Sequence, residues 1–539
     1  MLSGKQNRPE PTGAPSGRPG PLLKGAALSV LAALVLAGCG GGGGSPGVST
    51  QPSANQPATT STTGADDIIQ ASELSASICS APRTGIDPAT SQAYPDKQGT
   101  YVDEKNWLRA WIDETYLWFD EVPSTVRASD YGTPQALFKA LRTPVVLPSG
   151  KAKDQFHFLY DTAVWQALTT SGIEAGYGFE VAILKSTPPR DVRVAYTEPN
   201  TPASAAAIAR GARILFVDGV DVVQGSSVDA LNAALFPSGA GQAHTFRLQD
   251  LDGTVRTVTL TSAQITKTPV QNVTTVATGT GKVGYLLFND HVAPSEAQLI
   301  AAMTKFKADG VQDLVLDMRY NGGGLLDIAS ELAFMVAGSA RTSGAAFERL
   351  QFNNKNPFNL TDAQTVTSFH STTQGFSAGS GQALPQLGLS RVTVLTGAGT
   401  CSASESVING LRGVNVQVTQ IGATTCGKPY GFIPKDNCGT TYFAIQFKGV
   451  NNQGAGDYSD GLAPTCSVAD DFSHPLGNVA EGRLAAALSY RSTGACPPAS
   501  ATSSLALQSS VLSGGEALLS GKSPARENRL LRPGLISPP

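Results

Sequence analysis

Strands and helices alternate over residues 283–490, and this alternation limits the fold more than any other feature. The apolar runs "VGYLLF", "DLVLDM", "RVTVLT" and "VQVTQIG" are typical of buried strands, and helical patterns lie between them. Such alternation predicts an α/β layer built on parallel strands. In sheets of this kind, active sites gather at the carboxyl ends of the strands, where loops turn into helices. Gly-rich turns follow two of the strands, in "LVLDMRYNGGG" and "VTVLTGAGTCSASES", so we expect the site there.

A serine nucleophile fits the second of these turns. Ser402 follows a strand and precedes the helix "ESVINGLRG", where free N–H groups carry positive potential and Ala403 can donate to a developing oxyanion. The turn formed by residues 321–324 can supply a second donor, because glycine allows close backbone approach. Lys428 follows the strand "VQVTQIG" and can act as a general base if burial lowers its pKa. These residues predict a Ser–Lys pair for acyl transfer.

Other interpretations of the same residues stay open. A serine at a helix start is commonly a cap, and Ser404 with Glu405 could fill that role. His291, in "NDHVAP", is the best candidate for a histidine-based triad, although no acid with suggestive spacing accompanies it. Cys401 could itself be nucleophilic, but we expect it to be packed or to form a disulfide.

Two further segments precede this core. Residues 171–263 contain short strands and two short helices, and "TPASAAAIARGARILFVDGV" resembles a PDZ domain of the bacterial protease type. The resemblance implies a groove that holds a peptide as an added strand, with its carboxylate on the N–H groups of Tyr177, Gly178 and Phe179. The alternative is a small β domain used only for packing.

Residues 96–170 carry helices with an aromatic stripe. This pattern predicts a small N-terminal helical domain.

The motifs "LVLDMRYNGGG", "GTCSASES" and "GATTCGKPYG", in this order, resemble the C-terminal processing (tail-specific) proteases of serine peptidase family S41. The resemblance covers roughly residues 100–490. It implies a protease core at 280–492 with the layered sheet and helices of the ClpP/crotonase type. It also implies Ser402 as nucleophile, Lys428 as base, and the N–H groups of Gly323 and Ala403 as oxyanion donors. The expected function is cleavage, through an acyl-enzyme, of protein substrates recognised at their C-termini, without a metal or other cofactor.

One residue departs from the family pattern. Many members have a glutamine four residues after the lysine, which orients it, and this chain has Phe432 there. Because this side chain makes no hydrogen bond, either another group orients Lys428 or the activity is weakened. The alternative function is therefore a weak or inactive PDZ-bearing lipoprotein that binds partners on a protease scaffold.

The N-terminus predicts export. A basic segment precedes the apolar run "GAALSVLAALVLAGC", which is too short to span a bilayer and fits a signal peptide, residues 1–39. The ending "LAGC" resembles the bacterial lipobox, which implies lipidation of Cys39. Gly40 rather than Asp follows it, which implies the periplasmic side of the outer membrane. Residues 40–95 and 499–539 are predicted to be a flexible linker and a disordered tail.

Cysteines and charge complete the expectations. Six cysteines remain besides Cys39, and an even number in an oxidising compartment favours disulfides. The first candidate pair is Cys426 with Cys438, which flank a turn-rich segment. No cysteine or histidine spacing is typical of a zinc site.

The charge of the chain is nearly balanced, with 39 Lys and Arg against 42 Asp and Glu. This balance argues against a nucleic-acid partner. The sequence does not indicate an oligomeric state.

Overall fold

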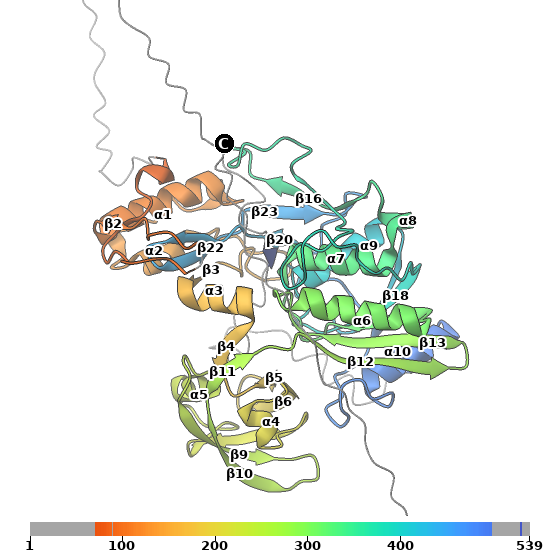
Figure 1. Cartoon of the computed structure of the whole chain (residues 1–539). Helices are drawn as coiled ribbons and strands as arrows, with labels where there is room; N and C mark the ends of the chain where they lie inside the picture. Colours follow the sequence, from red (N-terminus) through yellow and green to blue (C-terminus); the bar gives the residue numbers. More distant parts are fainter. Residues whose placement is uncertain (1–70, 89, 499–528, 531–539) are drawn as a thin grey trace, which may run out of the picture. The chain divides into compact units, whose positions relative to one another are not determined.

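The computed structural model describes residues 71–88, 90–498 and 529–530 (Figure 1). The predicted signal peptide, Cys39 and residues 40–70 of the predicted linker lie outside the described residues, as does most of the predicted tail. Within the part that the structure describes, no helix combines the length and the apolar character needed to cross a membrane.

A six-stranded sheet forms the centre of the predicted protease core. Its first two strands are antiparallel, and every later strand is parallel to its neighbour, as the strand–helix alternation predicts. In spatial order the strands are β12 (Val270–Thr278), β13 (Gly281–Phe288), β14 (Asp313–Asp317), β18 (Arg391–Thr396), β19 (Gln417–Gly422) and β24 (Cys466–Ser467). The helices are α6 (Ser295–Asp309), α7 (Leu326–Ala337), α8 (Ser339–Thr342), α9 (Ala403–Gly413) and α10 (Gly482–Thr493).

Both faces of this sheet are buried. Leu286 and Phe288 of β13 pack in one cluster with residues of α6, α7 and α9. Tyr285 and Leu287, which alternate with them, pack in a second cluster with residues of α10 such as Leu484. Because side chains alternate along a strand, a strand covered on both faces reads as a continuous apolar run. This explains the unbroken "VGYLLF" pattern.

Residues 179–261 build a separate β unit with its own apolar cluster. Its sheet has the order β10-β9-β7-β6-β5, so that β5 is an edge strand. Thr201 caps the short helix α4, whose first residue is Pro202, a favoured residue at that position. The elements are β5 (Phe179–Lys185), β6 (Asp191–Thr197), α4 (Pro202–Ala205), β7 (Arg213–Val217), β8 (Val220–Asp221), α5 (Val228–Leu235), β9 (Ala243–Gln249) and β10 (Val255–Thr261). The strands β4 (Ile173–Gly176) and β11 (Ala263–Thr266) pair at its base.

The N-terminal helices share one apolar core with residues 280–492, the predicted protease core. They are α1 (Tyr101–Thr115), α2 (Pro134–Ala140) and α3 (Thr162–Ser171). Trp107 and Trp111 of α1 stack with ring centroids 5.5 Å apart, and both rings contact Tyr442 of strand β22 (Thr440–Phe443). The same buried cluster contains Trp107 and residues of α7 and α9. The aromatic stripe is therefore buried, as predicted, but it belongs to the same buried cluster as α7 and α9 of the predicted protease core.

Short regular elements occur in the described parts of the predicted linker and tail. Residues 72–79, inside the predicted linker, contain the 3₁₀ turn η2 (Ser72–Leu74) and strand β1 (Ile78–Cys79). Within the predicted tail, β25 (Arg529–Leu530) pairs in parallel with β15 (Gly324–Leu325). The remaining elements are β2 (Lys97–Gln98), η3 (Phe119–Glu121), η4 (Ala128–Asp130), β3 (Phe158–Asp161), β16 (Ala346–Phe352), β17 (Val366–Ser368), β20 (Tyr430–Gly431), β21 (Lys435–Asn437) and β23 (Phe447–Val450).

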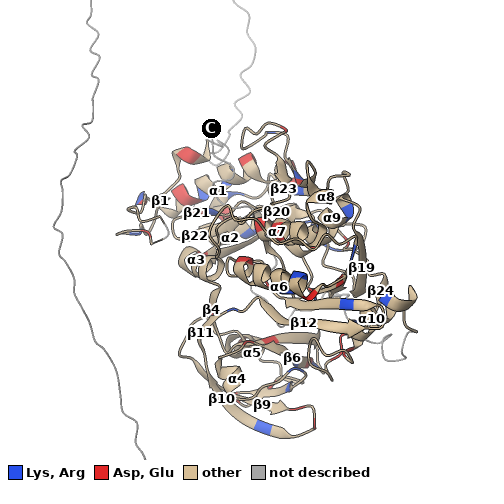
Figure 2. Cartoon of the chain, turned by 45° about the vertical axis from the view of Figure 1, so that its right-hand side comes forward, with Lys and Arg blue, Asp and Glu red and all other residues tan. Residues whose placement is uncertain are grey.

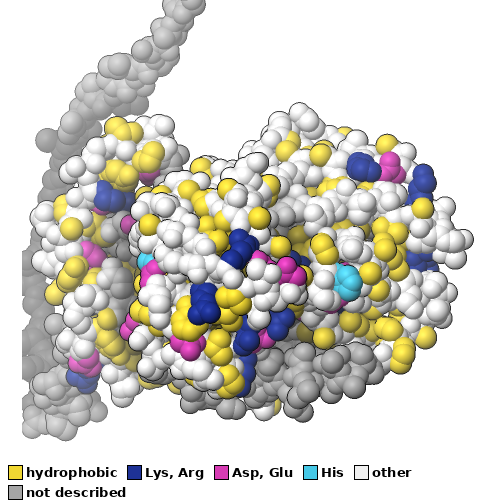
Figure 3. All heavy atoms as spheres, turned by 90° about the horizontal axis from the view of Figure 1, so that it is seen from below, with side chains coloured by type: hydrophobic (Ala, Val, Ile, Leu, Met, Phe, Trp, Pro, Cys, Tyr) yellow, Lys and Arg dark blue, Asp and Glu magenta, His cyan; other side chains and the backbone are white. Residues whose placement is uncertain are grey.

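Basic and acidic residues are interspersed along the ribbon of the described chain (Figure 2). On the face seen in Figure 3, charged side chains of both signs lie among apolar ones. This mixture agrees with the nearly balanced composition of the sequence.

Candidate active site

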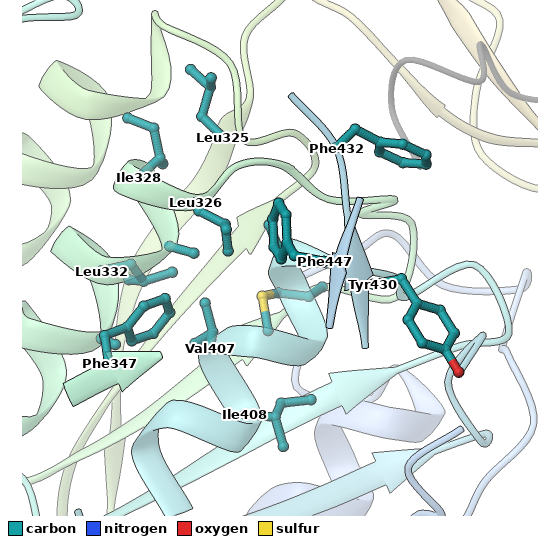
Figure 4. Packing of buried hydrophobic residues seen from close by; sticks show 14 of the residues in the cluster. Leu325, Leu326, Ile328, Leu332, Phe347, Val407, Ile408, Tyr430, Phe432 and Phe447 are labelled. Atoms are coloured by element: carbon teal, nitrogen blue, oxygen red, sulfur yellow. The ribbon is translucent and has the colours of Figure 1, made fainter. Parts of the chain in front are cut away.

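Ser402 lies where β18 gives way to α9, as predicted. It is the residue before the first turn of α9 and has φ 60° and ψ −116°, a conformation that non-glycine residues rarely adopt. Its side chain is completely buried. Strained backbone of this kind persists only where the surrounding structure enforces it, and it gathers at functional sites. Val407 and Ile408 of α9 belong to the same buried apolar cluster as Leu326 of α7 and Phe447 of β23 (Figure 4), so the helix that follows Ser402 is anchored in the core.

The turn of residues 321–324 lies directly against Ser402. Gly323 has φ +110°, and a Cβ atom there would lie 2.8 Å from Ser402 Cβ and 3.0 Å from the Ala403 nitrogen. Only glycine allows this approach. The Gly323 N–H, however, donates to Asn321 Oδ1 at 2.9 Å. Gly323 therefore lies beside Ser402, but its N–H is engaged by Asn321 and would have to leave it to serve as an oxyanion donor.

Asn321 also holds His291, and sequence reasoning missed this role. Asn321 Nδ2 donates to the Phe288 carbonyl at 3.0 Å, and its Oδ1 lies 3.0 Å from His291 Nδ1. Because Oδ1 can only accept, His291 carries its proton on Nδ1. Burial lowers the pKa of His291 to about 4. The ring is therefore neutral at pH 7, and Nδ1 faces an amide where a histidine-based triad would need an acid.

The buried neutral His291 predicts a loss of stability in acid. In the unfolded chain, the His291 ring is protonated near pH 6.5. In the folded chain, burial lowers its pKa to about 4. The free energy of unfolding should therefore fall by about 3 kcal/mol from this group as the pH drops from about 6.5 to 4. Urea unfolding of the natural chain and of His291→Gln at pH 7 and pH 4.5 measures it. All other titratable groups are the same in the natural chain and in His291→Gln. An equal loss of unfolding free energy in the two proteins between pH 7 and pH 4.5 would therefore contradict the prediction.

Lys428 is completely buried on the loop that follows β19. Its Nζ lies 4.2 Å from the centroid of the Phe432 ring and 4.6 Å from that of Phe156. Phe432 therefore contacts the amine, although by its aromatic face and not by a hydrogen bond. Among the described residues, Ser402 Oγ has no hydrogen-bond partner, so Ser402 and Lys428 are not hydrogen-bonded to each other in this structure.

Glu405 joins the two loops that carry Ser402 and Lys428. Its Oε2 accepts the N–H groups of Ser402 and Lys428, each at 2.9 Å. Its Oε1 accepts the Gly427 N–H at 2.9 Å and the Thr425 hydroxyl at 2.5 Å. Burial raises the pKa of this carboxyl, and the four donors counteract that effect. The sequence indicated that Glu405 could take part in a helix cap. It could not indicate that two loops far apart in the chain both donate hydrogen bonds to this carboxylate.

Ser404 does not cap the helix. Its hydroxyl donates to the Asn321 carbonyl at 3.1 Å, so it links α9 to the glycine turn. The residue at the cap position is Ser402.

A disulfide joins the same two loops, and the predicted pair Cys426–Cys438 was wrong. Cys401 bonds Cys426, with Cα atoms 5.2 Å apart. The reason is that β18 and β19 are parallel neighbours, so the loops at their carboxyl ends meet. The other disulfides are Cys79–Cys438 and Cys466–Cys496. Cys401 is therefore paired, which leaves it no thiol for nucleophilic attack.

The predicted peptide-binding residues line a groove on the β unit. Tyr177 and Gly178 form the turn between β4 and β5, and Phe179 begins the edge strand β5. The groove has a volume of about 590 Å³ and is bordered by β5 and α5, with apolar residues such as Leu235. At Gly178, with φ +88°, a Cβ atom would lie within 2.5 Å of the Thr201 side chain. The turn therefore requires glycine.

Two segments of the chain match models of known protein families. Residues 103–155 match the peptidase S41 N-terminal domain, and residues 282–448 match peptidase family S41. A carboxyl-terminal-processing protease of Picosynechococcus sp. is 32% identical over 31% of this chain and 39% of its own length. A chloroplastic C-terminal processing peptidase of Tetradesmus obliquus is 27% identical over 46% of this chain and 52% of its own. The chain thus spans less than two thirds of these curated relatives.

A solved structure shares the fold. A protein of Bacteroides fragilis assigned to the S41 proteases superposes with a TM-score of 0.55 at 23% identity, over 75% of this chain and 98% of its own. The two ordered matches support a relationship of residues 103–155 and 282–448 to peptidase family S41, and the solved structure shows a shared fold.

Proposed function

We propose that this protein is a serine endopeptidase with Ser402 as nucleophile and Lys428 as general base. The observation that carries the proposal is the convergence of three loops: the nucleophile turn, the glycine turn that touches it, and the base loop tied to it by Glu405 and a disulfide. The buried serine would attack a peptide carbonyl, with its proton passing to the lysine amine. Water would then hydrolyse the acyl-enzyme.

The oxyanion donors follow from the same arrangement. Ala403 begins α9, where the helix N-terminus carries positive potential. The Gly323 N–H becomes available when Asn321 turns away from it, which a substrate carbonyl could bring about by competing for that donor. In this proposal the structure is the resting state of the enzyme, and substrate binding would complete the oxyanion site.

The groove on the β unit supports selection of substrates by their C-termini. An edge strand can receive a peptide as an added strand, and its apolar lining suits apolar terminal residues. The test is cleavage of one unfolded protein substrate made with a free and with an amidated C-terminus. Faster cleavage of the free form is expected, and equal rates would contradict C-terminal recognition.

The glycine turn of the groove gives a sharper prediction. Gly178→Ala should weaken binding of a fluorescent peptide with a free apolar C-terminus by at least about tenfold, because the turn must shift away from Thr201. Gly219→Ala is the matched control, since Gly219 also has a positive φ but a Cβ atom there would meet nothing within 4 Å. Equal affinities of the two variants would contradict this role for the turn.

A second function is also worth a test because one observation favours it. Ser402 Oγ has no hydrogen-bond partner among the described residues, and the Gly323 N–H is occupied. A binding protein on a protease scaffold would show the same features permanently. Such a protein would bind the C-terminal peptide but would cleave no substrate.

The proposed location is the periplasmic side of the outer membrane, with a lipid anchor on Cys39. Its support is the N-terminal sequence pattern, together with three disulfides that suit an oxidising compartment.

A further inference from the structure

The disulfide Cys401–Cys426 lies within the proposed catalytic machinery. Cys401 directly precedes Ser402, and Cys426 lies two residues before Lys428. The Cys426 N–H also donates to the Thr400 carbonyl at 3.0 Å. One covalent bond therefore spans the loop of the nucleophile and the loop of the base. The other disulfides join β1 to the loop after β21 and β24 to the segment after α10, and none of their cysteines adjoins Ser402 or Lys428 in sequence.

The two sulfur atoms differ in their surroundings. Cys401 is 2% exposed, whereas Cys426 is partly exposed, so an incoming thiolate can reach the sulfur of Cys426 first. Cys401 would then be the leaving group. It lies next to the N-terminus of α9, whose positive potential stabilises a thiolate. Displacement of a stabilised thiolate is fast. Glu405 Oε2, 3.4 Å from Cys426 Sγ, opposes an anion on the Cys426 side, which also favours Cys401 as the leaving sulfur.

We propose that Cys401–Cys426 is a redox control site of the peptidase, an inference that depends on the proposed function. A dithiol reductant attacks Cys426 Sγ, the S–S bond breaks, and Cys401 leaves as a thiolate that takes up a proton. The second thiol of the reductant then attacks the mixed disulfide and releases Cys426. The reductant becomes a disulfide. The protein disulfide takes up two electrons and two protons and so becomes two thiols.

Reduction would loosen the base loop. After it, no disulfide links the two loops next to Ser402 and Lys428, and the hydrogen bonds of both loops to Glu405 remain. Small displacements of reacting groups cost large factors in rate. The oxidised chain is therefore the active form, and a freshly made, reduced chain is held inactive until it reaches an oxidising compartment.

The test is a redox titration of the purified full chain with dithiothreitol. Each point is assayed for proteolysis, and each cysteine is then alkylated and mapped by mass spectrometry, so that Cys39 is counted separately. A chelator is present, because the ligand atoms of Cys401, Glu405 and Cys426 lie within 4.8 Å of one another and the free thiols could bind zinc. We expect activity to fall at least tenfold in step with alkylation of Cys401 and Cys426, and to return on reoxidation.

Matched variants assign the effect to one disulfide. Cys401→Ala/Cys426→Ala should be as slow as the reduced chain and insensitive to the reductant. Cys466→Ala/Cys496→Ala should keep the activity and the sensitivity of the natural chain. The Cys401→Ala/Cys426→Ala variant could fail to fold. Near-UV circular dichroism of the reduced natural chain therefore tests separately whether the chain stays folded without this disulfide.

The outcomes separate the two proposals. An oxidised chain that cleaves nothing overturns the proposed function and the redox control with it. An active chain whose rate is unchanged after mapped reduction of Cys401–Cys426 overturns the redox control alone. Loss of activity that follows another disulfide, or global unfolding, also overturns it.

Discussion

Replacement of Ser402 with alanine should lower proteolysis by about a thousandfold or more. The substitution removes the only atom that can form the acyl bond in the proposed mechanism, while the small side chain fits a position that is already completely buried. The measurement is the initial rate of cleavage of an unfolded protein substrate at equal concentrations of the two proteins. The temperature of unfolding should change little, because Ser402 Oγ makes no hydrogen bond within the described residues.

The matched control for this substitution is Ser406→Ala. Ser406 is also a buried serine on α9, and its hydroxyl donates to the Ser402 carbonyl at 3.3 Å. Its loss should change the rate only a few-fold, because its hydroxyl donates to a backbone carbonyl and has no part in the proposed acyl transfer. A Ser402→Ala protein that still cleaves at the natural rate would contradict the assignment of the nucleophile.

Glu405→Gln should have the second largest effect. The carboxylate accepts two donors at each oxygen, whereas a glutamine amide has only one acceptor oxygen. Two of the four donors would then face an NH₂ group. We expect a loss of about 2–5 kcal/mol in the free energy of unfolding and a roughly hundredfold lower rate at a temperature where the variant is still folded.

Glu104→Gln is the control for burying an amide in place of a carboxyl. Glu104 is also buried, and its Oε1 accepts the N–H and the hydroxyl of Ser80, each at 2.8 Å. One amide oxygen can satisfy both donors, so this variant should keep the rate. If Glu405→Gln were as active as Glu104→Gln, the carboxylate would have no role in placing the base loop.

The sequence predicted those parts of the fold that depend on local pattern. The parallel sheet followed from buried apolar runs that alternate with helices, and the glycine turn beside Ser402 followed from its position after a strand. Gly323 could be foreseen because close backbone approach requires that residue type. In each case the local pattern gave the element and its position after a strand, whereas the pairing of the strands and the contact of Gly323 with Ser402 join residues far apart in the chain.

Features that depend on distant residues were missed or wrong. The partner of Cys426 was chosen as Cys438 because the two flank one turn, but the meeting of parallel strand ends pairs it with Cys401. The engagement of Gly323 by Asn321 and the approach of Phe156 to Lys428 could not be read from spacing either. Phe156 lies far before Lys428 in the chain, and only the folded structure brings the two together.

The central claim is that Ser402 becomes nucleophilic because Lys428 can take its proton. A biotinylated fluorophosphonate, which bonds only to activated serines, tests it on the oxidised full chain without any knowledge of the substrate. Peptide mapping should find the adduct on Ser402, and its rate of formation should fall sharply in Lys428→Met, which keeps the length of the side chain without the amine. The absence of an adduct, or an adduct on Ser402 that forms equally fast in Lys428→Met, would contradict the account.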